Sequence, residues 1–226
     1  MSSSKDDSKS NSSQARQLVE LAQSRCELYH DGSTNAYADI EVRGRREFVQ
    51  VGSLVFRDWL TDTALRENNS IPTTAVLDQV CVSLSTMARL KGSQCRIWSR
   101  IAHEGEFIWL DLCDDKHRII RIDRYDWWLD NQESVRFKRV LSMKPLPLPE
   151  VTTNNALHRL AELLQLEEDE LVLIVGFLLG VFHPPTGIEY PLLVVTGEQR
   201  SGKTLLCEAI TRIVDSRTDT VRRSEE

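Results

Sequence analysis

The sequence lacks three features that would fix its class at once. Its longest apolar run, Leu171–Phe182, is well short of the roughly 20 residues that a membrane-spanning helix needs. Basic residues do not predominate, since 28 Lys and Arg stand against 34 Asp and Glu, so the surface as a whole is not built to clamp nucleic acid. Five cysteines without CxxC spacing and five histidines without ligand spacing predict no disulfide frame and no zinc site. We therefore expect free thiols, a cytoplasmic location and no membrane partner.

The first fourteen residues also lack apolar side chains that could drive folding. They are rich in serine, contain no secretory or transit signal, and are predicted to form a disordered tail over residues 1–14. Beyond the tail, apolar residues at helical spacing predict six helices. Their expected ranges are Gln14–His30, Ser53–Glu67, Pro72–Gly92, Asn155–Leu164, Leu171–Phe182 and Lys203–Asp215. The fifth of these is apolar all round and is predicted to be buried.

Strand patterns occur in two regions. Ala36–Val42 and Glu47–Val51 are predicted to pair as a hairpin, and short alternating runs over residues 94–139 predict an antiparallel meander. Alternate prolines in residues 144–150 predict an extended connector. The predicted organisation is an α+β N-terminal domain over residues 15–143, this connector, and residues 151–226. The last part would contain a helical lead-in and the first strand, loop and helix of an incomplete P-loop NTPase domain, giving an α/β class overall.

One motif carries recognisable chemistry. A predicted buried-type strand, Tyr190–Thr196, is followed by a sequence of the form GxxxxGK[ST] and then by the predicted last helix. This order of strand, loop and helix is the one that a phosphate-binding loop requires. The candidate binding residues are Gly197, Glu198, Gln199, Arg200, Ser201, Gly202, Lys203, Thr204 and Leu205. The alternative is an ordinary surface turn between a strand and a helix.

Each residue type in this motif has a separate role. Glycines at 197 and 202 let the backbone approach a phosphate, and main-chain N–H groups at the helix start supply an anion site. Lys203 would place a positive charge on the β- and γ-phosphates, and the Thr204 hydroxyl would coordinate Mg²⁺. The predicted cofactors are therefore ATP and Mg²⁺, and no catalytic residue is assigned.

Hydrolysis needs further groups that the motif does not include. A Walker-B carboxylate and a water-positioning residue normally come from later elements, and only 22 residues follow Thr204. The sequence is thus interpreted as the N-terminal part of a longer ATPase, with a catalytically inactive remnant or a non-enzymatic interaction module as the alternative. Asp111 follows an apolar run as a Walker-B acid does, but it precedes the loop and is interpreted as an ordinary acid on an edge strand.

The chain resembles the phage- and mobile-element-encoded ATP-binding proteins related to primase-helicases. The resemblance is carried by HPPTGIEYPLLVVTGEQRSGKT over residues 183–204, with VRFKR and LPLP upstream. It implies a helicase-like P-loop ATPase that acts on nucleic acid, with DNA as a candidate partner, and it leaves the oligomeric state of the intact protein open. Arg200 stands where that family usually has glycine.

The meander offers a possible nucleic-acid surface. Arg96, Trp98 and Arg100 alternate and would share one strand face, as in grooves that bind single strands. Residues 94–139 contain equal numbers of basic and acidic side chains, which favours core packing beneath a solvated face of mixed charge.

Overall fold

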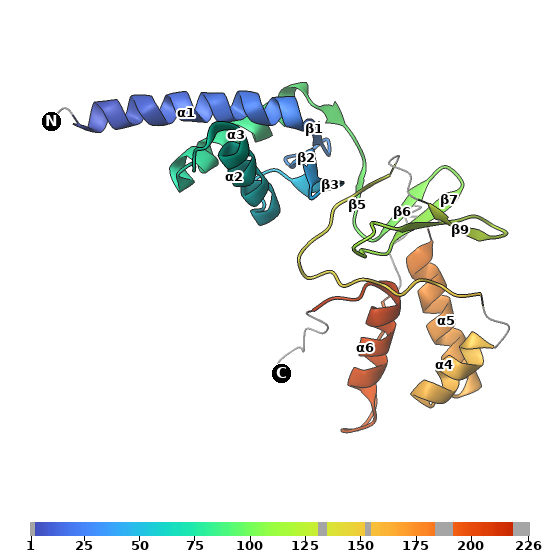
Figure 1. The fold of residues 1–226 in the computed structure, drawn as a ribbon. Coiled ribbons are helices and arrows are strands. Elements are labelled where there is room, and N and C mark those ends of the chain that lie inside the picture. The colour runs from blue at the N-terminus through green and yellow to red at the C-terminus, as the bar shows by residue number, and fades with distance from the viewer. Residues whose placement is uncertain (1–2, 131–134, 152–154, 184–191, 219–226) are drawn as a thin grey trace. The chain divides into compact units, whose positions relative to one another are not determined.

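The computed structural model describes residues 3–130, 135–151, 155–183 and 192–218. Within them the chain forms six helices and three small sheets, so the fold mixes α and β structure (Figure 1). The chain divides into two compact units, Met1–Trp98 with Arg136–Lys138, and Ser99–Val135 with Arg139–Glu226. The division therefore falls at the start of the meander and not in the proline-rich segment 144–150.

The first unit contains three helices and a four-stranded sheet that share one apolar core. The helices are α1 (Ser3–Arg25), α2 (Leu54–Asn68) and α3 (Thr74–Lys91), and the strands are β1 (Glu27–His30), β2 (Ala36–Val42), β3 (Arg45–Gln50) and β4 (Ser93–Gln94). The sheet order is β3-β2-β1-β4, with β1 antiparallel to β2 and parallel to β4. Because side chains alternate along a strand, Ala38 and Ile40 of β2 enter the core with Leu18, Phe56 and Leu84 of the helices.

The predicted hairpin and two of the predicted helices are confirmed. Strands β2 and β3 pair antiparallel around a short turn. Side-chain oxygens cap both helices, because Ser53 accepts a hydrogen bond from the N–H of Phe56 at 3.3 Å and Thr73 accepts one from Val76 at 3.4 Å. Helix α3 was expected to begin at Pro72, but Pro72 lies directly before its N-cap, Thr73.

The N-terminal helix differs from its predicted range at both ends. Helix α1 stops at Arg25, because Glu27–His30 pairs with β2 and obtains ladder hydrogen bonds in place of helical ones. It also begins at Ser3, within the segment 1–14 that the composition predicts to be disordered. Extending a helix that is already nucleated costs far less than starting one, so residues of low apolar content can continue it.

The second unit contains the predicted meander and three helices. Strands β6 (Ile101–Glu104), β7 (Phe107–Asp111), β8 (Ile119–Ile122) and β9 (Trp127–Asp130) lie side by side in chain order, all antiparallel. The helices are α4 (Ala156–Leu164), α5 (Glu168–Phe182) and α6 (Lys203–Val214), close to their predicted ranges.

The outermost runs of residues 94–139 do not join this meander. They form β5 (Ile97–Trp98) and β10 (Arg136–Phe137), which pair with each other in parallel within the first unit. Parallel strands need a long connection, and here the whole meander supplies it. The prediction of one antiparallel sheet over the full range is therefore wrong at its ends.

The proline-rich segment is held by the second unit. Leu146 is buried with Leu112 and Ile120, and its N–H donates to the carbonyl of Leu112 at 2.8 Å. Prolines at 145 and 147 cannot donate, but the leucine between them can. The expected free connector is thus a packed part of the unit, which explains why the chain does not divide there.

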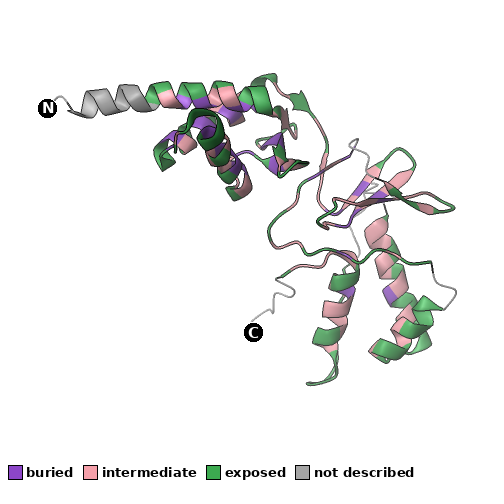
Figure 2. Ribbon diagram, viewed as in Figure 1, coloured by how far each residue is buried: buried purple, intermediate pink, exposed green. Residues whose placement is uncertain are grey.

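Helix α5 is apolar but only partly buried, contrary to the prediction that it is buried. It begins at Glu168, three residues before the predicted start, because Glu167 and Glu170 form a capping box at a helix end that favours negative charge. Ile174 is the one side chain of this helix that is buried, and Val172 and Leu173 are exposed. Figure 2 shows the helix in the colours of intermediate and exposed residues with one short buried stretch. Among the described residues, no helix has both the length and the apolar character needed to cross a membrane.

Candidate functional site

Residues 197–204 form a turn that leads directly into α6. Gly202 is the N-cap of the helix and has a φ of 84°, which glycine adopts without strain. Gly197 has a φ of 153°, and a Cβ on it would lie 2.9 Å from the Oγ of Ser201. Arg200 also has a positive φ, 71°, so it occupies a conformation that favours glycine. Both predicted glycine positions therefore coincide with backbone that needs glycine.

Lys203 folds back over this turn. Its Nζ donates to the carbonyl oxygen of Gly197 at 2.8 Å and to that of Glu198, and it lies 3.4 Å from the Oγ of Ser201. Backbone carbonyls thus hold the ammonium group at the turn. An anionic phosphate binds a cation more strongly than a neutral carbonyl does, so a phosphate could replace them. The arrangement places a positive charge beside the first N–H groups of α6.

The other predicted site residues surround the same turn. The N–H of Ser201 donates to the carbonyl of Glu198 at 3.3 Å, which closes the turn. Gln199, Thr204 and Leu205 are exposed, the last two in the first turn of α6. These residues are consecutive in the chain, and they form the turn and the first residues of α6.

The strand that should precede the loop is not formed in the described residues. Tyr190 and Pro191 lie outside them, and residues 192–196 carry no strand assignment. Leu192 is 88% exposed and Val194 is 70% exposed, although both were predicted to be in a buried strand. Their apolar character predicts a sheet neighbour, and no described residue supplies one.

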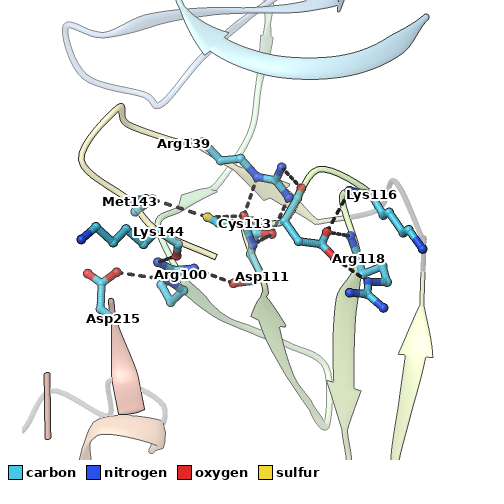
Figure 3. A network of polar contacts seen from close by, with 10 residues as sticks. Arg100, Asp111, Cys113, Lys116, Arg118, Arg139, Met143, Lys144 and Asp215 are labelled. Atoms are coloured by element: carbon cyan, nitrogen blue, oxygen red, sulfur yellow. Dashed lines mark hydrogen bonds and ion pairs between the residues drawn. The ribbon is translucent and has the colours of Figure 1, made fainter. Parts of the chain in front are cut away.

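A second cluster, which the sequence did not reveal, lies in the meander (Figure 3). Asp111 is 1% exposed and lies on β7, between β6 and β8, so the interpretation of it as an edge-strand acid is wrong. Its carboxylate accepts two hydrogen bonds from Arg139, from Nη2 at 2.6 Å and from Nε at 2.9 Å. It also accepts one from the N–H of Cys113 at 2.9 Å. No short-range spacing links residues 111 and 139, so only the fold could reveal this pair.

Arg100 belongs to the same cluster and not to a surface stripe. It is 3% exposed in the second unit, whereas Arg96 and Trp98 belong to the first unit, with the guanidinium of Arg96 4.2 Å from the Trp98 ring centre. The expectation that these three side chains share one strand face is therefore wrong. The chain bends at residues 99–100, directly after Trp98. Burial of the Arg100 guanidinium is tolerated because each of its nitrogens donates a hydrogen bond.

The Asp114 carboxylate organises the turn after β7. Burial acts to raise its pKa, but hydrogen bonds from the N–H groups of Arg118 and Lys116 and from the Arg118 guanidinium outweigh this and lower the pKa. The Asp114 carboxylate therefore stays ionised to a lower pH than an ordinary aspartate and keeps its hydrogen bonds within the turn.

The Cys113 thiol of this cluster is predicted to be unreactive. Burial, and then the Asp111 carboxylate, raise its pKa to about 12. Because the thiolate is the nucleophile, alkylation of Cys113 at pH 8 should be at least about a hundredfold slower than that of the same thiol in urea-unfolded protein. Mass-spectrometric mapping of iodoacetamide-labelled peptides over time measures this ratio. Equal rates for the folded and unfolded protein would contradict the buried, acid-paired environment.

Comparisons of the chain with models of protein families, with curated proteins and with solved structures found no match. Among the described residues, no group of three or more His, Cys, Asp or Glu side chains is placed to hold a metal ion.

Proposed function

We propose that residues 197–204 bind the phosphates of ATP and that the chain is the nucleotide-binding part of a helicase- or primase-like ATPase. The observation that carries this proposal is the position of Lys203 Nζ, over the carbonyls of Gly197 and Glu198 at the N-terminal end of α6. A lysine ammonium, free helix N–H groups and glycine backbone at one turn are what a polyphosphate needs. The resemblance to primase-helicase relatives extends the proposal to nucleic acid as the substrate.

Magnesium fits this site only together with the nucleotide. Mg²⁺ prefers oxygen ligands and is usually held by few protein groups, by phosphates and by water. The exposed Thr204 hydroxyl in the first turn of α6 offers one such oxygen. When bound, the ion would neutralise phosphate charge, and Thr204 would orient it.

Changing Lys203 to alanine tests the phosphate site. The substitution removes a charge-assisted contact worth about 1.5 to 3 kcal/mol, so affinity for ATP·Mg²⁺ should fall at least about tenfold. Titration with a fluorescent ATP analogue, followed by competition with ATP, measures both dissociation constants.

Lys116→Ala provides the matched control, because this lysine is exposed in a turn of the meander. It should bind ATP as the parent does. Equal affinity of Lys203→Ala and the parent would refute the phosphate site, and so would a parent protein that binds no ATP.

A non-enzymatic interaction module is the second candidate. The exposed apolar side chains of Leu192, Val194 and Leu173 favour it, because such surfaces commonly contact other polypeptide. The nucleotide titration separates the two functions, since an interaction module needs no Lys203-dependent affinity for ATP.

A further inference from the structure

Helix α6, which carries Lys203 at its first position, has little apolar packing. Ile210 is its one buried side chain, while Leu205 is 61% exposed and Ile213 is 41% exposed. Buried apolar area normally fixes a helix on its domain, and here little is available. Polar contacts must therefore supply much of what holds α6 in place.

These contacts gather at the C-terminal end of the helix. Asp215 directly follows α6, and its Oδ1 accepts a hydrogen bond from Arg100 Nε at 3.0 Å. The remaining guanidinium nitrogens donate to backbone carbonyls, Nη1 to Asp111 at 3.2 Å and Nη2 to Lys144 at 2.9 Å and Ser216 at 3.2 Å. One buried arginine thus joins the end of α6, strand β7 and the proline-rich segment (Figure 3).

A short backbone ladder reinforces this junction. The N–H of Lys144 donates to the carbonyl of Ser216 at 2.8 Å, and the N–H of Thr218 donates to that of Ser142 at 2.9 Å. Met143 and Arg217 form the antiparallel bridge between them. Residues 216–218 therefore lie along residues 142–144, and Arg100 bonds to both segments.

We propose that Arg100 is a positioning residue for the phosphate loop, acting through Asp215 and α6. This inference rests on the proposed nucleotide site. A helix of 12 residues is about 18 Å long, so a swing of about 5° at its fixed end moves the loop by about 1.6 Å. Charge-assisted hydrogen bonds do not tolerate displacements of this size. A nucleotide held by contacts outside the loop would then no longer have its phosphates within reach of Lys203.

Two variants test the role. Arg100→Ala removes all the hydrogen bonds that the guanidinium donates to Asp215, Asp111, Lys144 and Ser216. Asp215→Asn keeps the size and shape of the side chain, which is partly exposed, but removes its charge. We expect affinity for ATP·Mg²⁺ to fall about tenfold in Arg100→Ala and by a smaller factor in Asp215→Asn. Arg212→Ala, which removes an exposed arginine from α6 itself, should bind as the parent does.

Hydrogen exchange separates positioning from a general loss of structure. In a folded Arg100→Ala protein the amides of α6 and those of Lys144 and Thr218 should exchange faster, while those of β7 and β8 stay protected. The affinity loss should also vanish when Lys203 is already alanine, because the two residues would act on one contact. If Arg100→Ala destabilises the meander itself, Asp215→Asn provides the same comparison in an intact meander.

The outcomes are distinguishable from those of the nucleotide proposal. A parent protein that binds no ATP overturns the proposed function and, with it, the positioning role. A parent that binds through Lys203 while both variants, folded, bind equally well overturns the positioning role alone. Faster exchange in α6 with unchanged affinity also overturns the positioning role, because Arg100 would then anchor the helix without serving the site.

Discussion

Replacing Asp111 with alanine is expected to lower the free energy of unfolding of the second unit by about 3 kcal/mol. The carboxylate is 1% exposed, and its removal leaves the Arg139 guanidinium without its bidentate partner and the N–H of Cys113 without an acceptor. Unpaired buried polar groups cost more than the pair contributes when intact, so the loss should be large for a single substitution. The Arg139 side chain is 27% exposed, so water recovers part of the loss.

Equilibrium unfolding in urea, followed by tryptophan fluorescence, measures this change. Glu106→Ala is the matched control, because Glu106 is an exposed acid in the turn between β6 and β7. It should alter stability by no more than about 0.5 kcal/mol. A loss for Asp111→Ala that is no larger than that of the control would show that the Asp111–Arg139 pair contributes nothing to the fold.

A fragment of residues 151–226 is expected not to fold. It lacks Arg100 and Lys144, which donate hydrogen bonds to Asp215 and Ser216 at the end of α6. Within the described part of the fragment, Ile174 and Ile210 are the buried apolar side chains, far too few to offset the entropy of ordering three helices. The exposed apolar residues should make the fragment aggregate.

A longer fragment of residues 99–226 is the control. It retains the meander, the proline-rich segment and the junction at Arg100, and it should melt cooperatively in circular dichroism. The prediction for the short fragment is contradicted if that fragment is monomeric and also melts cooperatively. In that case residues 151–226 would complete their own fold, and the incomplete-P-loop interpretation would have to be abandoned.

Local patterns were reliable where local forces decide the structure. Ser53 caps its helix, and the turn between β2 and β3 was also predictable, because each depends on residues within a few positions. The geometry of the loop at 197–204 is local as well, although its binding of phosphate stays a prediction. Gly197, Gly202 and Lys203 meet because they lie in one turn.

Long-range pairing could not be predicted in this way. Glu27–His30 continues a helical pattern, yet it forms a strand because β2 and β4 lie on either side of it. Residues 97–98 and 136–137 pair in parallel across the whole meander, and no spacing in the sequence indicates that partnership. The predicted burial of α5 failed for a related reason, since apolar character shows what a helix would bury but not whether a neighbour is present.

The sequence by itself determined the positions of most helices, the meander strands and the phosphate-loop motif, because these follow from capping, periodicity and spacing within short segments. Only the tertiary structure decided that Asp111 and Arg100 are buried, that the proline-rich segment packs on the meander, and that Asp215 fastens the helix of the loop. Such contacts join residues more than 100 positions apart, as Arg100 and Asp215 are at a separation of 115. Charged residues pair in a protein interior where the folded backbone brings them together, and a linear pattern of charges carries no record of that meeting.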